Sequence, residues 1–134
     1  HVHLSASQVS RRIARLLGEG VIRGQVALLD EERLGLGVEA YVAVSLSSYA
    51  PEIVLRFHQR MTMLEEVLSC SATTGDSDYL LRIVARALRA YSQLMNTELL
   101  GDVASVRSSV VLDRIKHTTA VPLPPSPRPA ARAG

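Results

Sequence analysis

The sequence predicts an α+β protein whose main body is an antiparallel sheet packed against two helices. Three observations lead to this prediction. Short apolar runs with a two-residue period alternate with two stretches whose apolar residues recur at helical spacing. These segments follow the order strand, helix, strand, strand, helix, strand. A basic segment with the pattern of a capped helix, then an apolar extended stretch, precede them.

Size and composition place the chain among ordinary globular proteins. Its 134 residues suffice for one or two small domains, and 47% of them are hydrophobic and 21% charged. No apolar run reaches the roughly 20 residues that span a bilayer, and no secretory signal is present. The lone Cys70 fits a reducing compartment. We therefore expect a cytoplasmic protein without a membrane anchor.

The charge is unevenly distributed. Residues 1–24 carry Arg11, Arg12, Arg15 and Arg23 against the single acidic Glu19, whereas residues 25–116 are mildly acidic. A basic head on an acidic body is expected when only the head meets a polyanion. The chain opens without Met and without a start signal for a first helix, so we expect upstream residues to be absent from it.

The basic head contains one predicted helix. Ser5 and Gln8 have the spacing of a capping box. Val9, Ile13, Leu16 and Leu17 form one apolar stripe, and Gly18 and Gly20 end the helix. The polar face carries Ser, Gln and Arg, which are donors suited to phosphates and base edges. A solvated arginine-rich face would give the same pattern.

The next residues are predicted to be extended. Val21–Leu29 is β-branched and apolar with a bend at Gly24, and Asp30–Gly35 is a charged loop. A long apolar strand without a partner in its own domain would be an exposed edge. This segment therefore favours a dimer.

The body is predicted from its alternating periodicities. We expect strands at 38–46, 67–74, 79–85 and 103–116, and helices at about 51–66 and 88–99. This βαββαβ order is that of a ferredoxin-like domain, in which both helices cover one face of the sheet. The other face carries Leu80, Arg82 and Val84 or the opposite set, depending on register, and is expected to pack on another subunit. Asp113-Arg114 and Glu65-Glu66 are interpreted as solvated surface.

The turn between the second and third strands carries two carboxylates. Gly75 permits a positive φ, and Asp76 and Asp78 bracket the bend. These acids build the turn, or they form a polar notch able to hold an ammonium group. The pattern alone does not decide between the two interpretations.

Several blocks together resemble the Lrp/AsnC family of feast/famine transcription regulators. They are Thr74–Leu81, Gly20–Gly24, Leu34-Gly35 and Val110–Leu112, within a resemblance that extends over about residues 4–123. The resemblance implies a partial helix-turn-helix at 1–24, of which Leu4–Gly20 is the recognition helix. It also implies a hinge strand and linker at 25–35 that pairs with a second subunit, and a ligand-binding and oligomerisation domain at 36–123. The Pro- and Ala-rich residues 124–134 are predicted to be disordered.

The resemblance also implies functional residues. The effector, an amino acid or related metabolite, is expected at Thr74, Gly75, Asp76, Ser77 and Asp78, in a pocket completed where dimers meet. Double-stranded DNA is expected at Ser5, Ser7, Gln8, Arg11, Arg12, Arg15 and Arg23. Because the bracing helices are absent, we expect the isolated chain to bind DNA weakly or not at all.

The predicted function is a DNA-binding, amino-acid-sensing regulator that forms a homodimer or a higher homo-oligomer. The alternative is an amino-acid-binding module that acts by protein association without DNA. No nucleophile with a neighbouring base, phosphate loop or metal cluster is recognisable, so we expect no enzyme, no cofactor and no metal. His1 and His3 are interpreted as frayed terminal residues.

Overall fold

The fold is that of a computed structural model, which describes residues 5–99 and 101–125. One compact unit spans Asp30–Ile115, and a second holds the head helix together with the residues after 115. His1, His3, Leu100 and residues 126–134, which make up most of the predicted disordered tail, lie outside the described residues. Within the described part, none of the helices has the length and apolar character to cross a membrane.

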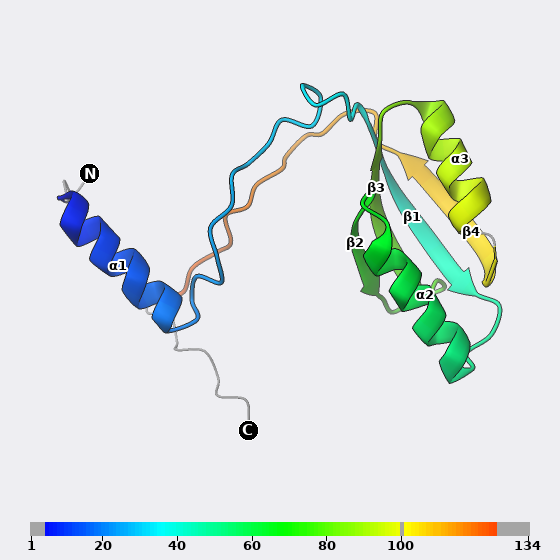
Figure 1. The fold of residues 1–134 in the computed structure, drawn as a ribbon, viewed down its shortest axis with the longest axis horizontal. Helices are drawn as coiled ribbons and strands as arrows, with labels where there is room; N and C mark the ends of the chain where they lie inside the picture. The colour runs from blue at the N-terminus through cyan, green and yellow to red at the C-terminus, as the bar shows by residue number, and fades with distance from the viewer. Residues whose placement is uncertain (1–4, 100, 126–134) are drawn as a thin grey trace. The chain divides into compact units, whose positions relative to one another are not determined.

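The larger unit contains a four-stranded antiparallel sheet (Figure 1). Its strands are β1 (Val38–Leu46), β2 (Val67–Ala72), β3 (Tyr79–Ala85) and β4 (Val103–Val110), in the spatial order β2-β3-β1-β4. Helix α2 (Pro51–Met63) follows β1 and helix α3 (Leu88–Glu98) follows β3. The predicted βαββαβ order is thus confirmed.

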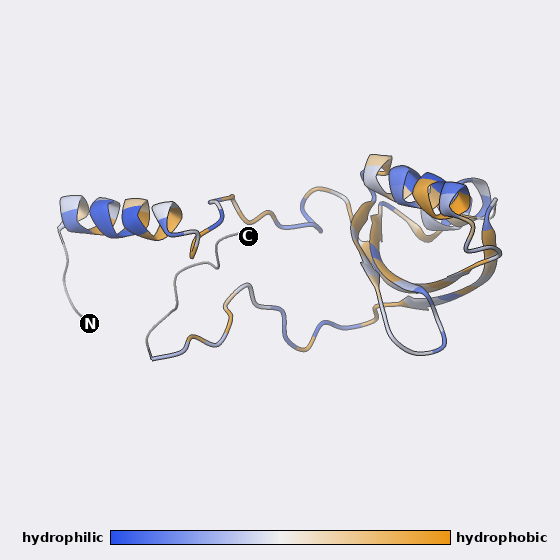
Figure 2. Cartoon of the chain, turned by 90° about the horizontal axis from the view of Figure 1, so that it is seen from below, coloured by the Kyte–Doolittle hydropathy of each residue, from blue (hydrophilic) through white to orange (hydrophobic). Residues whose placement is uncertain are grey.

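Both helices cover one face of the curved sheet, as Figure 2 shows. The core between the layers holds Phe57 of α2 and Tyr91 of α3, with exposed fractions of 1% and 7%. The sheet contributes alternate residues of its two central strands: Ala40, Val42, Val44, Leu46, Leu81, Ile83 and Ala85. This alternation is the two-residue period that predicted the strands.

Strand register decides which residues occupy the uncovered face. Val42 pairs with Leu81, and both side chains point into the core. Since side chains alternate along a strand, Leu80 and Arg82 lie on the opposite face beside Tyr41. Tyr41 and Leu80 are each 41% exposed, so this face keeps an uncovered apolar area.

Three predicted boundaries were wrong. β4 ends at Val110 rather than near Lys116, because Val110 pairs with Ala40 and β1 begins only two residues earlier, at Val38. β2 ends at Ala72 rather than Thr74, where its partner β3 begins. α2 ends at Met63 rather than 66, because Leu64 takes an extended ψ of 112°.

The head unit contains helix α1 (Ala6–Gly18), and its predicted capping box is present. The Gln8 N–H donates to the Ser5 hydroxyl, and the Ser5 N–H donates to the Gln8 side chain. No residue of α1 is buried, so its apolar stripe is largely uncovered in this chain. Residues 23–30 form no helix or strand within the chain, so pairing of this hinge with a second copy stays a prediction. Residues 118–123, which are described, form no strand.

Candidate functional site

The predicted ligand turn is held by its own backbone and by strand β1. Thr73 donates its N–H to the Asp78 carbonyl, which closes the bend between β2 and β3. Gly75 has a φ of 107°, a conformation that non-glycine residues rarely adopt. The Asp78 N–H donates to the Val44 carbonyl of β1 over 2.9 Å. The turn therefore has a fixed place at one end of the sheet.

Asp78 anchors the turn through its side chain as well. Its Oδ2 accepts the backbone N–H of Leu46 at 2.9 Å, and both carboxylate oxygens accept the Tyr49 hydroxyl at 3.0 Å. The hydrogen bond to Asp78 and the charge of that carboxylate raise the pKa of Tyr49, so the phenol stays protonated as a donor. Of the two interpretations of this acid, turn building is therefore realised. Its remaining lone pairs still leave room for a ligand donor.

Asp76, unlike Asp78, does not hold the turn in place. It is exposed, and its carboxylate makes no hydrogen bond or ion pair with any other described residue. The backbone N–H groups of residues 74–77 likewise have no acceptor among the described residues. A free carboxylate beside free N–H groups offers one partner for an ammonium and several for a carboxylate.

Two open grooves in the described part of the chain lie away from the turn. One open groove of about 430 Å³ lies between α3 and β4, lined among others by Tyr91 and Met95. A second groove of about 430 Å³ lies between α2 and β2, lined among others by His58 and Cys70. Neither is lined by any of the residues Thr74–Asp78.

Tyr49 and Leu46 are site residues that the sequence reasoning missed. Both follow from topology, because β1 and β3 are antiparallel neighbours. The residues that end β1 must then lie beside the residues that begin β3. No local motif marks Tyr49, which sits in the loop before Pro51 with 70% of its surface exposed.

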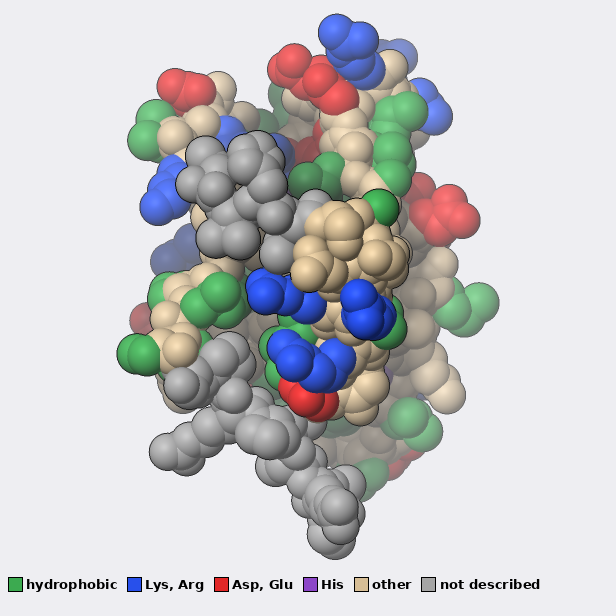
Figure 3. Space-filling view, turned by 90° about the vertical axis from the view of Figure 1, so that its left-hand side faces the viewer, with side chains coloured by type: hydrophobic (Ala, Val, Ile, Leu, Met, Phe, Trp, Pro, Cys, Tyr) green, Lys and Arg blue, Asp and Glu red, His purple; other side chains and the backbone are tan. Residues whose placement is uncertain are grey.

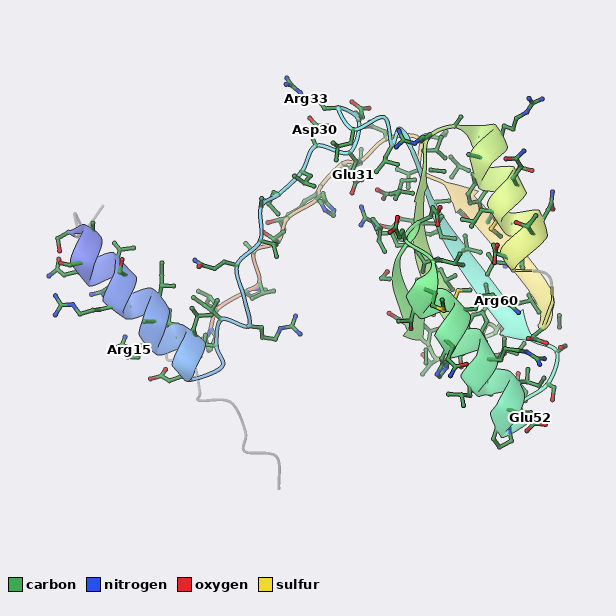
Figure 4. The ribbon with its side chains drawn as sticks, in the orientation of Figure 1. Arg15, Asp30, Glu31, Arg33, Glu52 and Arg60 are labelled. Carbon is green, nitrogen blue, oxygen red and sulfur yellow. The ribbon has the colours of Figure 1, made fainter. Side chains whose placement is uncertain are left out.

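The predicted DNA-contact residues lie on or beside α1. Ser5, Ser7, Gln8, Arg11, Arg12, Arg15 and Arg23 are all exposed. Figure 3 shows basic side chains gathered on this helix, and Arg15 is labelled in Figure 4. The capping box occupies the Ser5 hydroxyl and the Gln8 carbonyl oxygen. Arg11 donates its Nε–H to the Ser7 carbonyl. The guanidinium groups therefore supply most of the free donors.

Other chemistry is sparse. Within residues 5–99 and 101–125, no three His, Cys, Asp or Glu side chains cluster as a metal site requires. Burial raises the pKa of the Cys70 thiol, which disfavours the reactive thiolate. His58 forms a 2.8 Å hydrogen bond with the Tyr79 hydroxyl, next to the aromatic pair of Tyr79 and Phe57. We interpret these contacts as packing.

Comparison with known proteins defines the class. The Lrp/AsnC ligand binding domain matches residues 39–121, which contain the sheet, both helices and the turn. The chain belongs to the Lrp/AsnC family. The family domain is a ligand-binding one and the relatives are named as transcriptional regulators, so the chain is not an enzyme.

Individual relatives cover most of the chain. The Bkd operon transcriptional regulator of Pseudomonas aeruginosa is 37% identical over 124 residues, which is 91% of this chain and 81% of the relative. The DNA-binding transcriptional activator DecR of Escherichia coli is 32% identical over 126 residues, which is 91% of this chain and 82% of the relative. A transcriptional regulator from Neisseria meningitidis, solved as an L-Met complex, superposes with a TM-score of 0.82 at 38% identity, covering 89% and 78%. A feast or famine regulatory protein from M. tuberculosis complexed with L-methionine has a TM-score of 0.71 at 28% identity, covering 88% and 79%.

Proposed function

We propose that this protein is a cytoplasmic transcriptional regulator that binds DNA through its α1 head and senses an amino acid at the β2–β3 turn. The observation that carries the proposal is the match to the Neisseria regulator solved with L-Met, at 38% identity over 89% of this chain. A second relative, solved in complex with L-methionine, has the same fold. L-Methionine is therefore the first effector to test.

The chemistry of the turn suits an amino acid. Asp76 pairs with the α-ammonium, and the negative charge of Asp78 adds to this attraction. The free N–H groups of residues 74–77 donate hydrogen bonds to the α-carboxylate. Ser77 adds a hydroxyl, and Thr74 and Gly75 shape the bend. The ligand side chain then points out of the turn, into walls provided by a second copy of the chain.

Self-association is supported by apolar surface in both units. Tyr41 and Leu80 lie on the uncovered sheet face. In the hinge, Val26 is 86% exposed, Leu28 76% and Leu29 69%. Side chains this apolar and this exposed favour burial against an identical partner. We propose a homodimer that assembles further, with effector binding linked to assembly.

DNA recognition is supported by α1 and by the relatives, one of which is named as a DNA-binding transcriptional activator. Arg11, Arg12 and Arg15 present cations on one helix, and Arg23 follows it. Arginine binds phosphates and guanine edges, and Gln8 and the two serines add neutral donors.

A thermal-shift panel of the twenty amino acids tests the sensor. An effector present at about 100 times its dissociation constant stabilises the folded protein by about 2.7 kcal/mol. Asp76→Asn should abolish the shift, whereas Glu65→Gln, which removes an exposed carboxylate after α2, should keep it. If no amino acid raises the melting temperature, or if Asp76→Asn responds like the parent, the proposed site is wrong.

DNA binding by the complete gene product tests the head. Affinity for its own upstream region should fall with salt, with a log–log slope of about −0.9 for each phosphate neutralised. An amino-acid response without DNA binding at low salt would favour the alternative function, a sensor that acts by protein association.

A further inference from the structure

Four charged side chains form a closed ring at the end of the sheet remote from the ligand turn. Arg82 Nη2 lies 3.1 Å from Glu31 Oε1 and 2.9 Å from Glu39 Oε2. Arg114 Nη2 lies 3.2 Å from Glu31 Oε2 and also pairs with Glu39 Oε2. Each arginine thus contacts both glutamates, and the ring is neutral.

The ring is largely shielded from solvent. Side-chain exposure is 8% for Glu39, 18% for Arg82, 26% for Glu31 and 38% for Arg114. Burial alone would raise the pKa of Glu39, but the hydrogen bond from Arg82 and the charges of both arginines outweigh it and lower that pKa. Glu39 is therefore ionised at neutral pH. Arg114 is exposed, as predicted from sequence, and it also pairs with both glutamates, which the sequence did not predict.

A second ion pair in the same turn provides a contrast. Arg33 and Asp30 lie 3.8 Å apart with side-chain exposures of 88% and 59%. Figure 4 shows the Arg33 side chain directed away from the sheet. Exposed pairs of this kind contribute little to stability, whereas removal of one partner from a shielded pair leaves an uncompensated charge.

The ring sits where the chain enters and leaves the sheet unit. That unit begins at Asp30 and ends at Ile115, so Glu31 and Arg114 are each one residue inside a boundary. Backbone bonds reinforce both points: Leu36 donates to the Glu31 carbonyl and Val111 to the Glu39 carbonyl, each at 2.8 Å. Every connection between the sheet and the rest of the described chain therefore passes the ring.

The same two strands carry the ligand turn at their other end. Glu39 lies near the start of β1, and the last residue of β1, Leu46, donates to the Asp78 carboxylate. Arg82 lies on β3, which begins at Tyr79, directly after Asp78. A shift of the turn against β1 therefore acts on the strands that hold Glu39 and Arg82.

We propose that the Glu31–Glu39–Arg82–Arg114 ring couples effector binding at the β2–β3 turn to the two segments that connect the sheet to the rest of the chain. This inference rests on the proposed function, since it needs an effector at the turn. The ring fixes where residues 30–36 and 111–115 are anchored. Effector binding, by tightening β1 and β3, tightens both anchors together.

Hydrogen exchange on the complete protein, with and without saturating L-methionine, tests the coupling. In the parent protein, L-methionine should slow amide exchange at the turn and also in residues 30–36 and 111–115. Arg114→Met should speed exchange of both segments by about three- to fivefold, as expected for loss of the partly exposed pairs of Arg114 with the two glutamates. It should also abolish their response to L-methionine, while the affinity for L-methionine stays within about twofold.

Two controls isolate the ring. Arg33→Met removes a charge from the same turn and should leave all exchange rates unchanged. Arg114→Lys keeps a cation and should restore most of the response. Since Arg114 is the most exposed member, its substitution leaves the Glu39–Arg82 pair to hold the fold.

The outcomes separate the coupling from the proposed function. In the parent protein, L-methionine could protect the turn without any response in residues 30–36 and 111–115. That result would overturn the coupling alone. So would an Arg114→Met protein that responds like the parent. No change anywhere with L-methionine would overturn the effector assignment and the coupling with it.

Discussion

Asp78→Ala should destabilise the sheet unit, because this carboxylate holds the turn to β1. Its Oδ2 accepts the backbone N–H of Leu46, a residue that is only 5% exposed. Truncation to Ala leaves that N–H without its acceptor in a part-buried position. Its exposed neighbour Asp76 makes no bond with another described residue, so Asp76→Ala is the matched control.

The magnitude follows from the orphaned donor. A buried N–H that loses its partner costs about 1–3 kcal/mol. For a domain of this size, 1 kcal/mol lowers the melting temperature by roughly 4–8 °C. We therefore expect Asp78→Ala to melt about 4–24 °C below the parent. Asp76→Ala should remain within about 0.5 kcal/mol of the parent.

Urea unfolding at one fixed protein concentration measures the difference, because the stability of an oligomer depends on concentration. Asp78→Ala should lower the midpoint without changing the slope. Equal midpoints for the two alanine variants would refute the anchoring role of Asp78. Effector binding should distinguish the two variants in the opposite way. Asp76→Ala should lose the effector although it keeps the stability of the parent.

Three further predictions address the core, the acid limit and the DNA. Phe57→Ala should lower the free energy of unfolding by about 3–5 kcal/mol in urea, whereas Leu55→Ala on the exposed side of α2 should lower it by less than about 0.5 kcal/mol. Similar unfolding midpoints for the two variants would contradict the assigned core. The folded pKa of Glu39 lies below its ordinary value of 4.5, so its ionised form stabilises the fold above that pH, and this stability is lost as pH falls through the folded pKa. Glu39→Gln should flatten the fall in stability below pH 4.5, and an unchanged acid limb would contradict the role of the ring. Arg12→Ala should reduce the salt slope of DNA binding by about 0.9, while Arg33→Ala leaves it unchanged; equal slopes for both would place the DNA contacts elsewhere.

Sequence alone predicted the architecture of the sheet unit because its strands alternate cleanly. Val42 and Val44 on β1, and Leu81 and Ile83 on β3, follow the two-residue period that one buried face imposes. β1 and β3 were predicted to the residue for that reason. The boundaries of β2, β4 and α2 were not, because those ends depend on where the partner strand stops or where one residue turns extended.

The β2–β3 turn was predicted from its residues, but the different contacts of its two aspartates were not. Asp76 and Asp78 look equivalent in sequence. Only the pairing of β1 with β3 places Leu46 and Tyr49 against Asp78 and leaves Asp76 free. The charged ring was missed for a similar reason, since Glu31 and Arg114 are 83 residues apart and meet only through the fold.

An amide NMR titration of the complete protein with L-methionine shows directly where the effector binds. We predict that the largest chemical-shift changes fall on the backbone amides of Thr74–Asp78 and that Asp76→Asn removes them. A titration that leaves these five amides unmoved at millimolar L-methionine, or that moves only the groove between α3 and β4, would contradict it.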